Sequence, residues 1–401
     1  MIKGAKLTGQ PVFTQLLNLI DRRKIVSSVA KFDSDKRYRT FKTYDHLITM
    51  LYCIFHKCTS LREVTTGMQV CYTKLKHLGM NHSPRRSTFS DANQRRDPEV
   101  FEAIYHGLYH QYHKDLPDSR NKSKWFSRLY IEYSTTIPLF QDILKNAGRT
   151  PVNGKRKGGI KVHTLIKADE DVPSLINLNC AASHDVPFIK GLQLPKGSIV
   201  VFDKAYIDYA QYKLWSEEQV SWVCRLKKSS IYEVIEEKQI TLHHEKHGII
   251  SDQLIVLGHT SHENITRVKA RLITFWDSEN EREYKFITNQ FTFSPLTICQ
   301  IYKQRWQIEL LFKRIKSNYP LQYFLGDNEN AIKIQIWCTL IADLLIKIIQ
   351  STLKRKWAFS NLVSMIRIHL MTYTGLLAFL ENPEKMTLSY DYSNNKDPTL
   401  F

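Results

Sequence analysis

The stretch IYKQRWQIELLFKRIKSNYP (301–320) carries Tyr302, Arg305, Glu309 and Lys316 at separations of three, four and seven residues. At roughly 100° per residue, these positions fall within an arc of about 60° on one side of an α-helix. We therefore predict one amphipathic helix with four functional side chains along one edge. A neighbouring arc collects the apolar residues that pack such a helix onto the protein, namely Ile301, Ile308, Leu311, Phe312 and Ile315.

This edge presents a phenol hydroxyl, a guanidinium, a carboxylate and an ammonium group in a row. A carboxylate binds hard divalent cations, and the other three groups bind phosphate oxygens. The edge therefore fits a metal ion next to a nucleic-acid backbone. The alternative is an ordinary surface helix with an Arg305–Glu309 pair four residues apart, which is common. Spacing alone leaves both interpretations open.

The spacing Tyr-x2-Arg-x3-Glu-x6-Lys resembles the signature of the cut-and-paste bacterial transposases of insertion sequence family four, whose catalytic core is a DDE nuclease. VVFDKAYIDY (200–209) is similar to the second catalytic block of that family. The resemblance covers most of the 401 residues, and it implies an RNase H-like catalytic domain of the α/β class. Further stretches that resemble one subgroup are 3–20, CTSLREVTTGMQV (58–70), SPRRSTFSDANQRR (83–96) and 146–167.

The charge balance of the chain favours a polyanionic partner. There are 57 Lys and Arg residues against 39 Asp and Glu residues, which gives a formal net charge of +18. Such an excess is typical of proteins that bind nucleic acid. A merely basic soluble protein, or one that binds a membrane surface, has the same composition, so charge alone does not decide between them.

Cysteine usage and hydropathy indicate the cytoplasm. The seven cysteines lack the spacing of a disulfide framework, which favours a reducing compartment. The amino terminus, MIKGAKLTGQPVF, lacks the apolar core of a signal peptide. The most apolar segment, 331–350, is interrupted by Lys333, Gln335, Asp343 and Lys347, so we expect a buried amphipathic helix and no membrane span. We predict a cytoplasmic, nucleoid-associated protein.

The amino-terminal part of the chain has a helical pattern. We predict a helical DNA-binding domain over 1–80, with helices at 44–58 and 60–75, because apolar residues recur there every three or four positions. Ser60 is the expected cap of the second helix, ahead of Glu63. A helical linker region follows over 81–124.

One helix in this linker region is a candidate for reading bases. It is expected to begin at Ser87 or Thr88, after Pro84. Asn93 and Arg95 are expected on its exposed sides, where such side chains can reach base edges in a major groove. Two basic residues just before it, Arg85 and Arg86, can hold phosphates. The alternative is a solvated helix with a basic edge.

Residues 125–214 and 288–325 alternate short β-rich runs with helical stretches, which predicts the α/β layer of the catalytic domain. The 105 residues between Asp203 and Glu309 exceed what one crossover needs. Residues 326–401 are expected to form carboxyl-terminal helices and a tail.

We expect the excess residues to form a β-rich insertion at 215–287, which the resemblance also implies. Trp222 and Trp276 lie in it, where a tryptophan either stacks on a displaced base at a transposon end or belongs to the core. The runs that alternate like antiparallel strands are 220–228, 239–245, 252–261, 266–277 and 282–290.

The chemistry that the resemblance implies is cleavage and transfer of DNA strands by two divalent cations, Mg²⁺ or Mn²⁺, about 3.5–4 Å apart. Asp203 is the expected second ligand, because it ends the apolar run SIVVF (198–202) and a strand delivers it to the carboxyl edge of the sheet. Glu309 is the expected third ligand. The alternative for Asp203 is the cap of a helix or turn.

The first carboxylate of the expected set is missing. Where the subgroup has Asp-Ser-Thr-Thr-Ile, this chain has Tyr133 followed by Ser-Thr-Thr-Ile. A neutral phenol with a pKa of about 10 is a poor Mg²⁺ ligand and cannot bridge two cations. Glu132 is adjacent but points to the opposite face of a strand, and Asp142 lies past the strand. We therefore predict that catalysis is impaired.

Three alternative functions are consistent with these sequence features. The first, which the resemblance implies, is a transposase-type protein for cut-and-paste DNA transposition that binds double-stranded DNA at inverted repeats and target as a homodimer, with strand cleavage impaired by Tyr133. The second is a catalytically inactive DNA-binding protein that occupies transposon ends. The third is a non-specific nucleic-acid-binding scaffold. A footprint on inverted repeats separates the first two from the third, and metal-dependent cleavage separates the first from the second.

Overall fold

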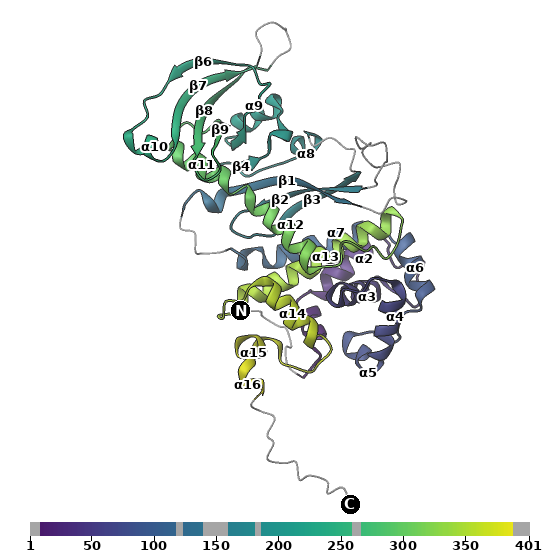
Figure 1. Cartoon of the computed structure of the whole chain (residues 1–401). Helices are drawn as coiled ribbons and strands as arrows, with labels where there is room; N and C mark the ends of the chain where they lie inside the picture. Colours follow the sequence, from purple (N-terminus) through teal and green to yellow (C-terminus); the bar gives the residue numbers. More distant parts are fainter. Residues whose placement is uncertain (1–8, 118–122, 139–158, 181–185, 259–265, 388–401) are drawn as a thin grey trace, which may run out of the picture. The chain divides into compact units, whose positions relative to one another are not determined.

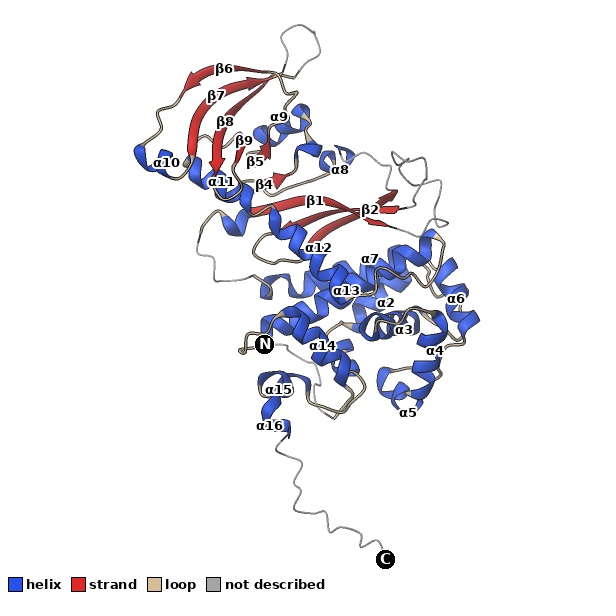
Figure 2. Ribbon diagram, in the orientation of Figure 1, coloured by secondary structure: helices blue, strands red, loops and turns tan. Residues whose placement is uncertain are grey.

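The computed structural model describes residues 9–117, 123–138, 159–180, 186–258 and 266–387 (Figure 1). Asp142 lies outside the described residues. The chain divides into two compact units, Met1–Leu116 with Arg314–Phe401, and Pro117–Lys313. The described part of the first is helical and that of the second contains the strands, so we call them the helical unit and the sheet unit (Figure 2).

The helical unit is built around α13 (Glu329–Thr352), which confirms the buried helix predicted over 331–350. Two polar residues that interrupt this segment, Gln335 and Asp343, are themselves buried. No helix among the described residues is long and apolar enough to cross a membrane. Helices α3, α6, α7 and α14 contact α13. The remaining bounds are α1 (Val12–Leu17), α2 (Arg22–Lys31), α3 (Thr43–His56), α4 (Leu61–Val70), α5 (Tyr72–Leu75), α6 (Arg86–Arg95), α7 (Glu99–Tyr112), α14 (Phe359–His369), α15 (Leu376–Glu381) and α16 (Pro383–Thr387).

Helices from both ends of the chain share this core, because amphipathic helices bury their apolar faces against one another whatever their separation in sequence. The helical unit joins residues that the sequence assigned to four regions, including residues 314–325, which were predicted to belong to the catalytic domain. As predicted, Ser60 caps α4, its hydroxyl accepting from the Glu63 N–H at 3.2 Å. Helix α6 begins at Arg86, slightly before the predicted start, and neither Ser87 nor Thr88 caps it.

His46 of α3 is fully buried, with its Nε2 2.7 Å from the Asn93 Oδ1. Burial, with the nearby charge of Arg96, lowers the pKa of His46 to about 3. In the unfolded chain this histidine takes up a proton near its ordinary pKa of about 6.5, whereas in the folded chain it stays neutral until about pH 3. The free energy of unfolding therefore decreases as the pH falls from about 6.5 towards 3.

From pH 7 to pH 5, this histidine is therefore expected to reduce the free energy of unfolding by about 2 kcal/mol. Urea unfolding of the full chain at both pH values measures the loss, and His46→Gln should remove that part of the pH dependence. The exposed His82, changed to Gln, is the control. Equal pH dependence of the His46 and His82 variants would contradict the prediction.

The strands of the sheet unit form one nine-stranded sheet in the order β3-β2-β1-β4-β5-β9-β8-β7-β6. Strands β1, β2 and β3 are antiparallel, β4 and β5 run parallel to β1, and the remaining strands continue antiparallel from β5. The protein therefore has a mixed α/β fold. The strand bounds are β1 (Leu129–Pro138), β2 (Gly159–Lys167), β3 (Pro173–Cys180), β4 (Ile199–Phe202), β5 (Ser221–Arg225), β6 (Tyr232–Glu237), β7 (Ile249–Leu257), β8 (Val268–Asp277) and β9 (Arg282–Thr288).

Helices α8 (Val186–Lys190) and α9 (Tyr209–Glu217) contribute to the buried apolar cluster on one face of this sheet. The cluster includes Phe202 of β4 and Trp215 of α9. Trp222 is fully buried in the same cluster, whereas Trp276 is 44% exposed. Helices α11 (Pro295–Lys303) and α12 (Trp306–Asn318) follow the last strand.

The predicted insertion at 215–287 is continuous with the rest of the sheet. Its first strand, β5, pairs in parallel with β4, so the purely antiparallel part begins later, at β6. The strand predicted over 239–245 is wrong. Helix α10 (Leu242–Lys246) forms there, because the Thr241 hydroxyl accepts from the His244 N–H and starts a helix. The edge strand β6 was missed because most of its residues are exposed and show no clear alternation.

The single helix predicted over 301–320 is also wrong. Helix α11 ends at Lys303 and α12 begins at Trp306. Between them, the Arg305 N–H bonds the Tyr302 carbonyl at 3.0 Å, three residues back, in place of the four-residue bond of an α-helix. Because the helix is interrupted at this point, a rotation of about 100° per residue does not give the direction of the Tyr302 side chain relative to those of Glu309 and Lys316.

Candidate functional site

Two neighbouring parallel strands lie side by side, and β4 ends beside the middle of β1. Strands β1 and β4 pair in the register Ile131↔Val201. Two residues further along, this register sets Tyr133 beside Asp203, which follows β4 directly. Side chains alternate between faces, and Phe202 belongs to the cluster packed with α9. Tyr133 and Asp203 therefore share the opposite face.

Asp203 opens a short turn as well as ending a strand. It is half-buried, and its Oδ1 accepts a hydrogen bond from the Ala205 N–H at 3.2 Å. Among the described residues, its Oδ2 has no hydrogen-bond partner. The capping role that the sequence left open is present, and one carboxylate oxygen is left for another ligand.

Helix α12 meets the same face of the sheet. Phe312 lies with its ring centroid 6.2 Å from that of Tyr133. Arg305, just before the helix, donates from Nη2 to the Glu309 Oε1 at 2.6 Å. The Arg305 Cζ also lies 5.8 Å from the Tyr133 ring centroid and 5.9 Å from that of Tyr302. One guanidinium therefore contacts a carboxylate and two aromatic rings.

The electrostatics of this group keep the phenol neutral. Burial raises the pKa of Tyr133, and the carboxylates of Glu309 and Asp203 raise it further, while Arg305 opposes them. For Arg305, burial lowers the pKa, but Tyr302 and Glu309 more than offset it, so the guanidinium stays charged. Asp203 and Glu309, with 105 residues between them in the sequence, thus both act on the hydroxyl of Tyr133.

Tyr302 is buried beside this group and is not displayed at a helix edge. Its ring lies 4.7 Å from that of Phe286 on β9, and its side chain is only 9% exposed. Its hydroxyl has no hydrogen-bond partner among the described residues. Burial raises the pKa of Tyr302 strongly. Sequence spacing missed both the burial of Tyr302 and the contact between Tyr133 and Phe312, which depend on the packing of distant strands.

Glu132 lies on the other face of β1, as strand alternation predicts. It is fully buried and pairs across the sheet with Leu165, a member of the cluster packed with α9. In this register it cannot replace Tyr133 as a ligand beside Asp203.

The residues of this site do not fit a pair of divalent cations. They supply two carboxylates, Asp203 and Glu309, and Arg305 already occupies one oxygen of Glu309. The third position is the neutral phenol of Tyr133. In the part of the chain that the structure describes, no group of three or more His, Cys, Asp or Glu residues has the geometry of a metal site. Two-metal chemistry needs carboxylates that bridge or share the ions.

The other predicted DNA-binding residues belong to the helical unit. Lys316 is exposed on the last turn of α12, and Arg85 and Arg86 are exposed at the start of α6. Arg95, also exposed, pairs with Asp91 at 2.8 Å.

The prediction that Asn93 lies on an exposed side of its helix is wrong. The side chain is 1% exposed and binds His46 in the core. A polar residue on the inner face of an amphipathic helix is buried when the core offers it a partner, and His46, 47 residues earlier, is that partner.

Two family models match long segments of this chain, and one of these segments contains most of the site. A family model described as a transposase DDE domain matches residues 134–345, which include Asp203, Arg305 and Glu309 and begin one residue after Tyr133. A second model, described as a domain of unknown function (DUF4372), matches residues 8–81.

Several relatives carry names that call them transposases. The protein y4zB of Sinorhizobium fredii is 27% identical over 66% of this chain and 72% of its own length. A Synechocystis protein named for insertion sequence element IS4SA is 27% identical over 72% of this chain and 78% of its own. A Geobacillus stearothermophilus protein named for insertion sequence element IS5377 is 26% identical over 62% of this chain and 64% of its own length.

Among solved structures, a piggyBac transposase synaptic complex with hairpin DNA aligns with 96% of this chain and 85% of its own, at 11% identity and a TM-score of 0.46. The sequence match is the stronger finding. Because the DDE-domain model covers more than half of the 401 residues, the chain belongs to the transposase DDE domain family.

Proposed function

We propose that the chain is a transposase-type DNA-binding protein for cut-and-paste transposition, of the family-four type, whose strand cleavage is impaired. It binds double-stranded DNA at transposon inverted repeats and at the target, as a homodimer in the cytoplasm. The observation that carries the proposal is Tyr133, in the middle of β1 at the position where the first carboxylate is expected, within electrostatic reach of Asp203 and Glu309.

The fold and the charge support this proposal. A carboxylate at the end of β4 and another on a later helix is the arrangement that an RNase H-like catalytic domain requires, and Asp203 and Glu309 have these positions. The net charge of +18 suits a DNA backbone. Without a third carboxylate the catalytic step lacks its metal ligands, so binding is retained and cutting is lost.

The test is binding and nicking of the same DNA by the unmodified chain. A duplex with the inverted repeats that flank the gene should be protected in a footprint, with no nicking in Mg²⁺ or Mn²⁺. Equal affinity for unrelated duplexes, without a footprint, would favour a non-specific scaffold. Absence of duplex binding would reject the proposal.

Arg305 and Lys316 are proposed to contact phosphate. Replacing either with Ala should weaken binding to end DNA and make the slope of log K against log salt shallower by about 0.9, the value for one lost contact. Arg305 is also paired with Glu309, so Arg305→Ala changes that contact as well. Lys313, exposed on the same helix, is the matched control. An unchanged slope in a folded Lys316→Ala protein would contradict the assignment.

A further inference from the structure

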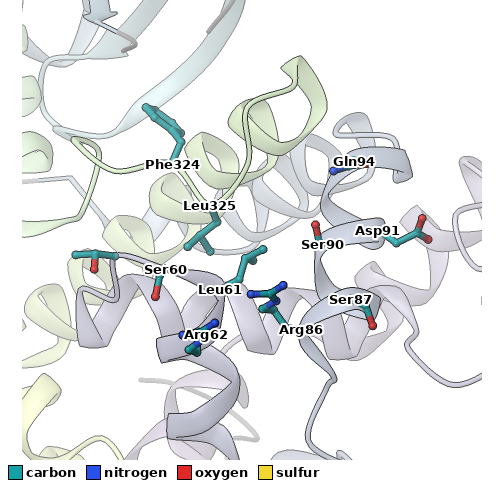
Figure 3. Close-up of a pocket in the computed structure, with 11 residues that line it drawn as sticks. Ser60, Leu61, Arg62, Arg86, Ser87, Ser90, Asp91, Gln94, Phe324 and Leu325 are labelled. Atoms are coloured by element: carbon teal, nitrogen blue, oxygen red, sulfur yellow. The ribbon is translucent and has the colours of Figure 1, made fainter. Parts of the chain in front are cut away.

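A groove in the helical unit lies between α4, α6 and the segment around Phe324 and Leu325 (Figure 3). Its cavity volume is about 770 Å³, within the range of ligand-binding pockets. Arg62 of α4 and Arg86 of α6 both line it. Figure 3 shows the Arg86 side chain extending from α6 towards Leu61 and Arg62.

The groove is positively charged. Neither Arg62 nor Arg86 pairs with a carboxylate of the described residues. The lining contains one carboxylate, Asp91, and this group is paired with Arg95 at 2.8 Å. Two exposed guanidiniums therefore have their planar donor pairs available, a geometry that matches the oxygens of a phosphate.

Further donors surround the two guanidiniums. The hydroxyls of Ser87 and Ser90 line the groove from α6, and neither bonds to another described residue. The first turn of α6 has no capping side chain, so its N–H groups add to the positive end of a ten-residue helix. These donors support the arginines in binding an anion.

The third wall of the groove is held in place before any ligand binds. The fully buried Gln335 donates to the Pro320 and Tyr323 carbonyls at 3.1 and 2.7 Å and accepts from the Leu325 N–H at 3.0 Å. Asn328 donates to the Gln94 carbonyl of α6 at 3.1 Å. A fixed wall lowers the ordering cost of binding.

We infer that this groove binds a phosphodiester of duplex DNA, gripped by Arg62 and Arg86. The inference rests on the proposed DNA-binding function and extends it to α4, within the segment matched to a domain of unknown function. The exposed mouth suits a long polymer, and phosphate contacts at the start of α6 orient the exposed Gln94 and Arg95 at its other end.

The experiment compares Arg62→Gln, Arg86→Gln and the double variant with Arg39→Gln, which removes an exposed arginine of the same unit outside the groove. Binding is measured by fluorescence anisotropy over a salt series, on the flanking inverted repeats and on a mixed-sequence duplex. The double variant should lose about the sum of the two single-variant effects. Each single groove variant should bind both duplexes about tenfold more weakly, since a hydrogen bond to a charged group is lost. Its salt slope should be shallower by about 0.9.

Arg39→Gln should match the unmodified chain. Arg62→Lys keeps the charge without the planar donor pair, so it should restore the slope but only part of the affinity. Thermal unfolding of every variant checks the fold, and Arg62→Lys or Arg86→Lys replaces the corresponding glutamine variant if that one fails to fold. If the unmodified chain binds duplex DNA and the groove variants match Arg39→Gln, the groove assignment is overturned. If the unmodified chain does not bind duplex DNA, the proposed function itself falls.

Discussion

Tyr133→Asp is expected to convert a non-cleaving protein into one that nicks end DNA in Mg²⁺ or Mn²⁺, with a rise in cleavage of at least about a hundredfold. Metal stabilisation of transition-state charge is worth several kcal/mol, and each 1.4 kcal/mol is about tenfold in rate. The strand, its register and the two remaining carboxylates are already present, so a single side chain is changed. Gel analysis of end-labelled DNA measures the effect.

The same substitution should also change stability in a metal-dependent way. An added carboxylate repels Asp203 and Glu309, which already act on this position, so the metal-free variant should be slightly less stable than the unmodified chain. Cations that bind only the folded state reverse the loss by mass action. Thermal unfolding with and without Mg²⁺ therefore reports the restored site without any activity.

Two controls separate ligand chemistry from loss of the ring. Tyr133→Asn removes the ring as Tyr133→Asp does but adds no carboxylate, so it should not cleave, and Asp203→Asn in the Tyr133→Asp background should abolish the gained cleavage. Strong metal-dependent cleavage by the unmodified chain would contradict the hypothesis that Tyr133 impairs catalysis. It would point to Glu132, which can reach the site only if β1 shifts its register, and Glu132→Gln would test that route.

Asp252→Ala is expected to reduce the free energy of unfolding of the sheet unit by about 3–5 kcal/mol, because it leaves a buried guanidinium without its counterion. Arg271 donates from Nε and Nη2 to the two oxygens of Asp252 at 2.7 and 2.6 Å, and both side chains are 4% exposed. Arg271 also donates to the carbonyls of Gln290 and Phe293, just ahead of α11, so this helix start should loosen too. Urea unfolding followed by tryptophan fluorescence measures the loss.

The matched control is Glu233→Ala. It removes the partner of Arg267, an ion pair with an N–O distance of 2.9 Å in the same antiparallel part of the sheet, but with side chains 49% and 66% exposed. Solvent screens such a pair, so its loss should stay within about 0.5 kcal/mol. Similar losses for the two variants would show that burial does not set the strength of these pairs.

Local sequence signals predicted the elements well where neighbours in the chain decide them. The three- and four-residue apolar spacing located α3 and α4, and Ser60 at the head of α4 caps it as expected. The helix over 331–350 was predicted correctly despite its polar residues. The failures, at α10 and at the break between α11 and α12, lie where a side-chain cap or a tightened turn outweighs periodicity.

The candidate site was only partly predictable. Sequence alone established that position 133 carries a phenol and that Asp203 follows an apolar run, because both are facts of the chain itself. Only the tertiary structure decided that Arg305 engages Glu309 and that Tyr302 is buried. Packing between distant strands and helices sets these contacts.

The same division holds in the helical unit. The sequence determined the basic residues of α6 and its helical period, yet the tertiary structure buried Asn93 against His46 and brought Arg62 to one groove with Arg86. The physical reason is the distance along the sequence over which each interaction acts. Helical periodicity and capping act over about four residues, so they can be read from the chain. Desolvation of a polar group depends on which partner the folded core supplies, and that partner is often far away in sequence.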